Sequence, residues 1–185
     1  GLPYGADWTT NAFNSNSVGA VTDRQRIDGL KSWSLGLGLN QDISIREKMT
    51  WFWYHFIPVD FYGIHIATSR YCGTNAARIC YDYIKMFRDN ATGNYKALIR
   101  MMATQPAMMF YLNNQANTNT APDENFAREV MELFTLGKDP LSQYTQDDVI
   151  QAAKVLTGWR VQNLNSYPTT TDFVSTYHDT SNKQF

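Results

Sequence analysis

Residues 44–56 read SIREKMTWFWYHF, and five of the last six side chains are aromatic. Ser44 and Glu47 have the spacing of a capping box, in which a hydroxyl and a carboxylate satisfy backbone N–H groups where a helix begins. We expect this helix to end near Phe56, because Pro58 cannot continue it. Apolar side chains occupy one broad face and much of the remaining surface, namely Ile45, Met49, Trp51, Phe52, Trp53, Tyr54 and Phe56. The stretch therefore predicts a central, largely buried helix.

Apolar residues recur at helical spacing on both sides of this stretch. We expect further helices from Thr22 to the glycines at 36 and 38, and over residues 75–90, 94–103, 106–112, 123–136 and 145–158. Residues 59–77 show no clear period, residues 113–120 (NNQANTNT) predict a polar loop, and residues 1–21 and 160–185 predict largely irregular chain, with Thr169–Thr171 extended. The predicted fold class is all-α: an irregular multi-helix bundle around a buried aromatic helix, with long loops and little or no β-structure.

The composition fits a single helical domain over residues 1–185. Hydrophobic residues make up 43% of the chain, enough to fill a sizeable core, whereas charged residues make up only 18%. The net charge of −1 gives no electrostatic basis for binding a phosphate backbone, so we expect no nucleic-acid partner. No apolar run reaches the length of a transmembrane helix.

Cys72 and Cys80 are the only cysteines of the chain. On one continuous helix they would lie roughly 12 Å apart along the axis, which is too far for a disulfide. If the segment between them loops, a bridge is feasible. We favour two buried thiols, and at this point the pairing stays open.

Three stretches together resemble one protein family. They read REKMTWFWYHF (46–56), GNYKALIRMMATQPAMMFYLNN (93–114) and PDENFAREVMELFTLG (122–137). The last is followed at a matching distance by YTQDDVIQAAKVLTGW (144–159) and by His178-Asp179. The pattern is similar to the bacterial family known as domain of unknown function 1800, and the similarity covers the chain from about residue 40 to residue 185. The family has no established activity, so the resemblance implies no mechanism.

The resemblance implies a location and an extent. Family members are typically exported and much longer, so we expect a periplasmic, cell-surface or extracellular protein, and an incomplete piece of a larger domain that packs on the remainder of its own chain. The family usually has WHNHF where this sequence has Trp53-Tyr54-His55-Phe56, one residue shorter and with a single histidine. This departure weakens any role that needs both histidines.

A carboxylate edge accompanies the apolar face of residues 124–136. At 100° per residue, Asn125, Glu129 and Glu132 fall within about 60° of one another. We expect Glu129 to be partly buried, so it must be paired, metal-bound or protonated. A functional interpretation makes Glu129 and Glu132 metal ligands or an acid/base pair that Asn125 orients. The structural interpretation, which we favour, gives Glu129 a salt bridge from Arg46, Arg88 or Arg160.

Two histidine positions complete the candidate set. His178-Asp179 lies in a polar stretch, where it could supply a ligand or a proton carrier, or form a solvated turn or a plug over neighbouring helices. His55 lies at the edge of the aromatic helix, where a hydrogen-bonded core residue is the commoner role and ligand binding the alternative. The sequence has no HExxH, paired ExxH or CxxC motif, so no metal ligand is assigned and a divalent metal is an option rather than a requirement.

Two functions fit these observations. We favour a binding or structural module of an exported bacterial protein, with a carbohydrate or a cell-surface protein as partner, because the surface is polar but uncharged and no catalytic signature is present. The alternative is an extracytoplasmic hydrolase. Its candidate catalytic residues are Glu129, Glu132, His178 and Asp179, and its candidate binding residues are Asn125 and His55.

Overall fold

The computed structural model describes residues 23–69, 76–138, 140, 142–164 and 166–185. Its α-helices are α2 (Asp23–Leu39), α3 (Arg46–Phe56), α4 (Phe61–Ser69), α5 (Ala76–Asp89), α6 (Tyr95–Met102), α7 (Pro106–Tyr111), α8 (Glu124–Glu129) and α9 (Gln146–Val155). A π-helical turn, η2 (Val130–Thr135), continues α8, and two short 3₁₀ turns are η1 (Asn114–Ala116) and η3 (Ser175–Tyr177). The predicted mostly helical fold is confirmed.

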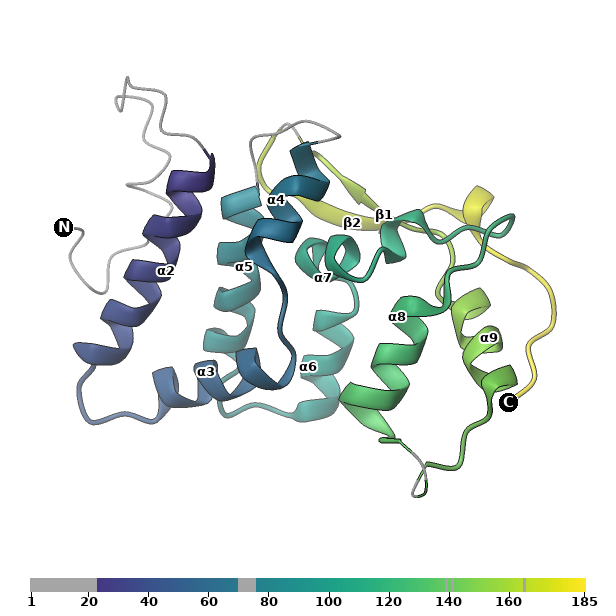
Figure 1. Ribbon diagram of the computed structural model, residues 1–185, viewed down its shortest axis with the longest axis horizontal. Helices are drawn as coiled ribbons and strands as arrows, with labels where there is room; N and C mark the ends of the chain where they lie inside the picture. Colours follow the sequence, from purple (N-terminus) through teal and green to yellow (C-terminus); the bar gives the residue numbers. More distant parts are fainter. Residues whose placement is uncertain (1–22, 70–75, 139, 141, 165) are drawn as a thin grey trace.

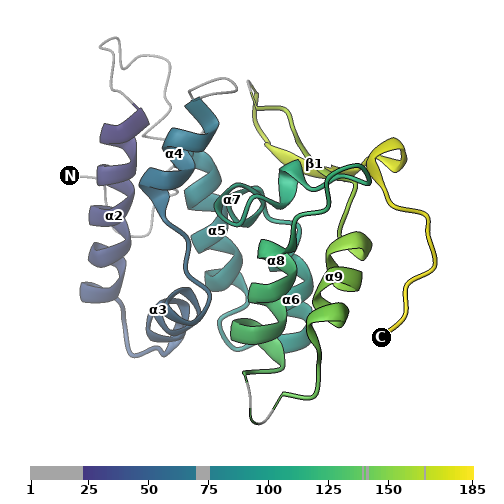
Figure 2. The same cartoon turned by 45° about the vertical axis from the view of Figure 1, so that its right-hand side comes forward.

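The helices form an elongated molecule, with α5 next to α2 toward one end and α6 and α7 near the middle (Figure 1). On one side, α2, α3 and α4 pack against α5. On the other side α8 and α9 lie side by side, as both views of the ribbon show (Figures 1 and 2). The main hydrophobic cluster runs from Ile27 and Leu30 in α2 to Phe126 and Phe134 in α8 and η2. A second, smaller cluster of Ala127, Val149 and Ala153 joins α8 to α9.

The central buried helix is α5, not the aromatic helix of residues 44–56. Nine side chains of α5 are buried, including Tyr83 and Phe87. In α3 only Glu47 and Thr50 are buried, and Phe52 is 52% exposed. The prediction of a buried α3 is therefore wrong, because the helix packs through one face and leaves its other aromatic side chains at the surface.

The start of α3 also differs from the predicted capping box. Ile45 occupies the N-cap position and makes no side-chain cap bond. The Ser44 hydroxyl accepts a hydrogen bond only from the backbone N–H of Arg46. Glu47 turns inward instead, where Arg88 Nε donates to its Oε1 at 2.7 Å. An ion pair between helices has replaced the local cap.

Two further boundaries depart from expectation. Helix α2 runs through Gly36 and Gly38 to Leu39, although glycines disfavour helix interiors. Gly36 is buried, and a Cβ at Gly38 would meet Trp51 Nε1 at 3.6 Å, an ordinary van der Waals distance, so Gly38 lies where α2 packs on α3. Helix α4 occupies part of the segment that showed no clear period.

The C-terminal region is less irregular than predicted. Strand β1 (Trp159–Gln162) pairs antiparallel with β2 (Thr170–Phe173), and Trp159 lies opposite Phe173. The extended Thr170 and Thr171 agree with expectation. The expectation for residues 160–185 is therefore wrong at this hairpin, because cross-strand pairing orders two short runs that carry little sequence signal. The predicted irregular segment 1–21 lies outside the described residues, as does Cys72 with any pairing it makes.

Residues 113–120 form the predicted polar loop, but two of its asparagines are buried. Asn114 and Asn117, here called the asparagine pair, are buried to 1% and 0% exposure. The Asn117 amide donates to Asn114 Oδ1 and to the carbonyl of Ala153, and Asn117 Oδ1 accepts from the backbone N–H of Asp123. The pair therefore ties the start of α8 to the end of α9. In the part of the chain that the structure describes, no helix has both the length and the apolar character to cross a membrane.

Candidate ligand-binding pocket

A pocket of about 430 Å³ lies between α2 and α3. The segment that leads into α4 forms its third side, and Ile84 of α5 contributes to its lining. Figure 1 shows the end of α2 close to the start of α3, with α4 and α5 as their neighbours. Apolar and aromatic side chains make up most of the wall: Leu35, Leu37, Trp51, Tyr54, Val59, Phe61 and Ile84. Its size and apolar wall are typical of sites for small organic molecules.

The α2 wall carries a buried hydroxyl. Lys31, Ser34 and Leu35 follow at the i, i+3 and i+4 positions that share one helical face. Ser34 is only 5% exposed, and its Oγ has no hydrogen-bond partner among the described residues. A buried polar atom without a partner is uncommon, because losing water without compensation costs about 1–3 kcal/mol. The pocket is therefore lined by a residue whose buried hydroxyl keeps an unused donor and acceptor.

The α3 wall is held in place by contacts to other elements. Glu47, Thr50, Trp51 and Tyr54 are spaced i, i+3, i+4 and i+7, so they share a face. Glu47 is fixed by its ion pair with Arg88. The Tyr54 hydroxyl donates to the carbonyl of Val59 at 2.9 Å. Burial, followed by the charge of nearby acidic groups, raises the pKa of Tyr54, so its phenol stays neutral.

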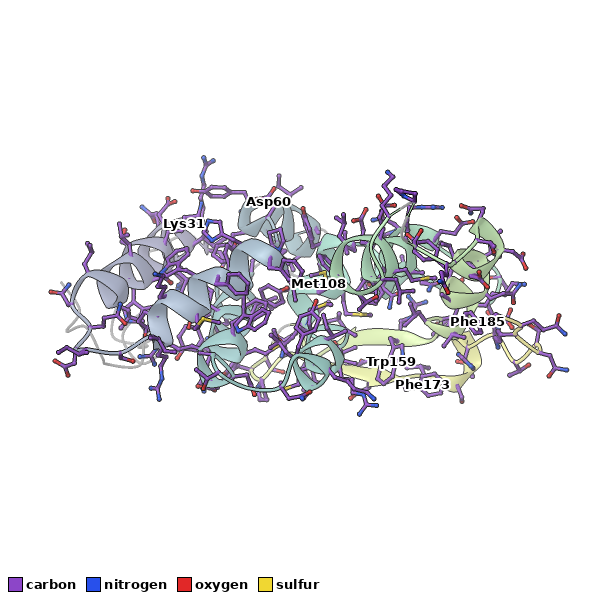
Figure 3. The ribbon with its side chains drawn as sticks, turned by 90° about the horizontal axis from the view of Figure 1, so that it is seen from below. Lys31, Asp60, Met108, Trp159, Phe173 and Phe185 are labelled. Atoms are coloured by element: carbon purple, nitrogen blue, oxygen red, sulfur yellow. The ribbon has the colours of Figure 1, made fainter. Side chains whose placement is uncertain are left out.

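Two opposite charges stand at the mouth of the pocket. Lys31 comes from α2 and Asp60 from the residue before α4, and both are exposed. Figure 3 places their labels along one side of the molecule, opposite Trp159 and Phe173, with Met108 between the two sides. No ion pair joins Lys31 to Asp60 in the described residues, so each charge can face a ligand.

The pocket was not among the sites predicted from the sequence. One signal was present: Ser34 occupied an inward position of the helical period with Ile27, Leu30 and Leu37, and a polar residue there is unusual. The convergence of α2, α3 and the α4 start is tertiary. No spacing within one helix could reveal it.

The predicted carboxylate edge is altered by the π-helical turn. After Glu129 the helix widens, and the Leu136 N–H bonds to the carbonyl of Met131, five residues back. The assumed 100° per residue therefore fails for Glu132. Glu132 pairs with the exposed Lys138 at 3.0 Å. Asn125 is exposed, and its amide donates to the Leu112 carbonyl.

Glu129 is half-buried, as expected, but its predicted salt bridge is absent from the described residues. Of the arginines proposed, Arg88 binds Glu47, and Arg160 donates to the carbonyl of Gln115 and lies over the Tyr177 ring. That structural interpretation of Glu129 is therefore wrong: Arg88 and Arg160 are engaged on other elements, and no ion pair joins Arg46 to Glu129 in the described residues.

His178 and Asp179 close the end of α9 as a plug. His178 Nδ1 lies 3.0 Å from the carbonyl oxygen of Thr157, and the Asp179 N–H donates to the Thr157 hydroxyl. Lys183 pairs with the Asp179 carboxylate at 3.2 Å. Hydrogen bonds from Ser181, followed by Lys183, lower the pKa of Asp179 to about 2. The structural role that the sequence left open is thus the one these contacts support.

His55 does not join the other candidates. Its Nδ1 lies 2.8 Å from the carbonyl oxygen of Trp51, in α3. Figure 1 shows α3 apart from α8, α9 and the C-terminal segment. No group of three or more potential metal ligands gathers within the described ranges. The catalytic roles of Glu129, Glu132, His178 and Asp179 and the binding role of His55 stay predictions.

Comparison with protein families decides where this chain belongs. The family model described as protein of unknown function (DUF1800) matches residues 9–185. The chain belongs to this family. Comparisons with the curated proteins and with solved structures found no match. DUF1800 is a family of unknown function, and nothing about it indicates a specific activity.

In this DUF1800 protein, the stretches that carried the resemblance form separate elements. Residues 46–56 form α3, residues 93–114 contain α6 and α7, and residues 122–137 form α8 with its π-helical turn. Only the first of these stretches lines the pocket, through the face of Glu47, Trp51 and Tyr54. Lys31, Ser34 and Asp60 lie outside all of them, so the family pattern alone does not point to the pocket.

Proposed function

We propose that this DUF1800 protein is a binding module that holds a small, largely apolar molecule between α2 and α3. The observation that carries the proposal is the Ser34 hydroxyl, buried and without a partner in the described part of the chain, on the wall of an apolar pocket. A ligand with one hydrogen-bonding group would satisfy it, whereas an apolar wall alone would not need it.

Contacts that fix the wall residues indicate that the pocket is preformed. The Glu47–Arg88 ion pair joins α3 to α5, and the Tyr54–Val59 hydrogen bond joins α3 to the segment before α4. Fixed walls reduce the conformational entropy lost on binding. A module of this kind needs no catalytic group, which accords with the engaged state of Glu132, His178 and Asp179.

The proposal is tested with a neutral fluorescent probe, N-phenyl-1-naphthylamine. We expect saturable binding of one probe per chain. Leu35→Trp extends a larger ring over the pocket from a half-exposed position and should weaken binding at least about tenfold, since overpacking costs 1–3 kcal/mol. The matched control is Leu39→Trp, on the same helix but outside the pocket, which should bind like the parent. Non-saturable binding, or equal loss in both variants, would refute the proposal.

The hydrolase alternative has one observation in its favour. Glu129 is half-buried, lacks an ion pair in the described residues and stands where α8 passes into the π-helical turn, a distortion common at functional sites. Its metal-dependent form is tested by elemental analysis of protein purified without chelators. A stoichiometric divalent metal that Glu129→Gln releases would support it, and metal-free protein would remove it.

We also propose that the protein is exported. The support is compositional: charged residues make up only 18% of the chain, and the rest of its polar surface is uncharged. Fractionation of cells that carry the native gene, with an antibody raised against this chain, tests the proposal. Signal in the periplasmic, surface or medium fraction is expected. Signal confined to the cytoplasmic fraction would overturn it.

A further inference from the structure

We infer that the ligand of the α2–α3 pocket is a zwitterion: an amino-acid-like molecule with an apolar or aromatic body, an ammonium group and a carboxylate. The inference rests on the proposed binding function. Its basis is the pair of opposite charges at the mouth, Lys31 and Asp60, which come from different elements and do not pair with each other.

Tyr62 positions both charges. The Lys31 ammonium lies 3.8 Å from the centre of the Tyr62 ring, a cation–π contact that directs a flexible side chain. The backbone N–H of the same residue donates to Asp60 Oδ1 at 3.0 Å and so fixes the carboxylate at the start of α4. One residue therefore holds an ammonium and a carboxylate at the edge of one pocket.

The other charges near the mouth balance one another. Asp28 accepts a hydrogen bond from the Tyr62 hydroxyl, and Arg24 lies 5.3 Å from the centre of the same ring. Inside the pocket, Glu47 is neutralised by Arg88. The field at the mouth is thus set by Lys31 and Asp60. A ligand with one charge is attracted by one of them and repelled by the other, whereas a zwitterion satisfies both.

Ser34 offers the carboxylate of the ligand a second hydrogen-bond donor, beside the ammonium group of Lys31. It lies three residues after Lys31 on the same face of α2, about 4.5 Å further along the axis. A rotation of the Ser34 side chain toward the pocket would let a carboxylate that meets Lys31 also accept from its hydroxyl, which has no other partner in the described residues. The ammonium then faces Asp60, and the body of the ligand packs against Trp51 and Phe61.

Three compounds with the same aromatic ring separate the charges: L-phenylalanine, 3-phenylpropionate without the ammonium, and 2-phenylethylamine without the carboxylate. We expect calorimetric titration to give the tightest binding for phenylalanine, with the affinity of each analogue about twofold to fivefold weaker, as for exposed charge pairs. Lys31→Met should lower the affinity for phenylalanine to the affinity that the parent protein has for 2-phenylethylamine. Asp60→Asn should lower it to the affinity that the parent protein has for 3-phenylpropionate. Asparagine keeps the acceptor for Tyr62, so the start of α4 is preserved.

The control and the contrary outcomes are distinct. Lys48→Met removes an exposed lysine of α3 that does not line the pocket, and it should leave all three affinities unchanged. If the three compounds bind equally, or none binds while N-phenyl-1-naphthylamine does, the zwitterion inference is wrong and the binding function stands. If the neutral probe also fails to bind, or binds without regard to Leu35→Trp, the binding function itself is wrong.

Discussion

At the residue scale, the side chains outside the pocket that we expect to matter most for stability are those of the asparagine pair, Asn114 and Asn117. Asn117 uses both amide hydrogens and its oxygen, and it does so at 0% exposure. Such a group stabilises a structure only while every partner is present, because each partner is also buried away from water. The sequence predicted a polar loop here, since asparagine in a turn-rich run most often faces solvent. Nothing in residues 113–120 marked two of them as buried.

Asn117→Ala should therefore be costly. It leaves the Asp123 N–H and the Ala153 carbonyl without their partner, and we expect a loss of about 3 kcal/mol in the free energy of unfolding. Urea denaturation followed by circular dichroism measures this. Asn119→Ala, an exposed neighbour with one bond to the Thr176 carbonyl, should change stability by less than about 0.5 kcal/mol. Equal effects at both positions would contradict the buried network.

Asp179 makes stability depend on acid pH. Its pKa is about 2 in the folded chain, below the ordinary value of about 3.9, so the unfolded chain binds the proton more readily. The stabilisation is complete above about pH 4 and is lost as the pH falls toward 2. Asp179→Asn should lower stability at neutral pH and flatten its decline between pH 4 and 2. If the free energy of unfolding of the two proteins falls in parallel between pH 4 and 2, Asp179 is not the group responsible for the acid dependence.

At the scale of the element, α3 shows what an aromatic sequence does and does not predict. Its end before Pro58 was predictable, because proline forbids continuation. Its burial was not, since aromatic residues cover nearly the whole circumference and so mark no inward face. The face that lines the pocket is the one that carries Glu47, Thr50 and Tyr54, where polar atoms find partners on other elements.

The same helix supports a paired prediction. Glu47→Ala removes one member of a buried ion pair and should cost about 2–3 kcal/mol, the low end for such a change because the Arg88 side chain is 30% exposed and can turn to water. Ser44→Ala should cost less than about 0.5 kcal/mol, since Ser44 makes a single exposed contact rather than a cap. Thermal or urea unfolding of both variants decides the matter. If Ser44→Ala instead lowers the free energy of unfolding by about 1 kcal/mol, the predicted capping box at Ser44 is supported.

At the scale of the whole molecule, the sequence predicted most helices but not their assembly. Caps such as Asn94, Asp123 and Thr145 act locally, through the first turn of their own helices, so they can be read from short stretches. The pocket needs α2, α3 and the start of α4 to meet. The carboxylate edge failed for a related reason, because the π-helical turn after Glu129 changes the angle that separates Glu129 from Glu132.

The main hydrophobic cluster reaches from α2 to Phe126 and Phe134, so we expect the two sides of the molecule to unfold together, and Cys80 can report on it. Cys80 is fully buried in α5, and burial, followed by the charge of Asp23, raises the pKa of its thiol. In a Cys72→Ser background, 5,5′-dithiobis(2-nitrobenzoate) should therefore label Cys80 only when the core opens.

The two destabilising substitutions lie on opposite sides of α5 and make this a test of cooperativity. Glu47→Ala acts on the ion pair that joins α3 to α5, the helix that carries Cys80, whereas Asn117→Ala acts between α8 and α9. If one core joins the two sides, both should speed labelling by the factor that corresponds to their loss of stability, about tenfold per 1.4 kcal/mol. If Asn117→Ala weakens the chain yet leaves the labelling rate unchanged, the α8–α9 side opens on its own, and the asparagine pair stabilises that side alone.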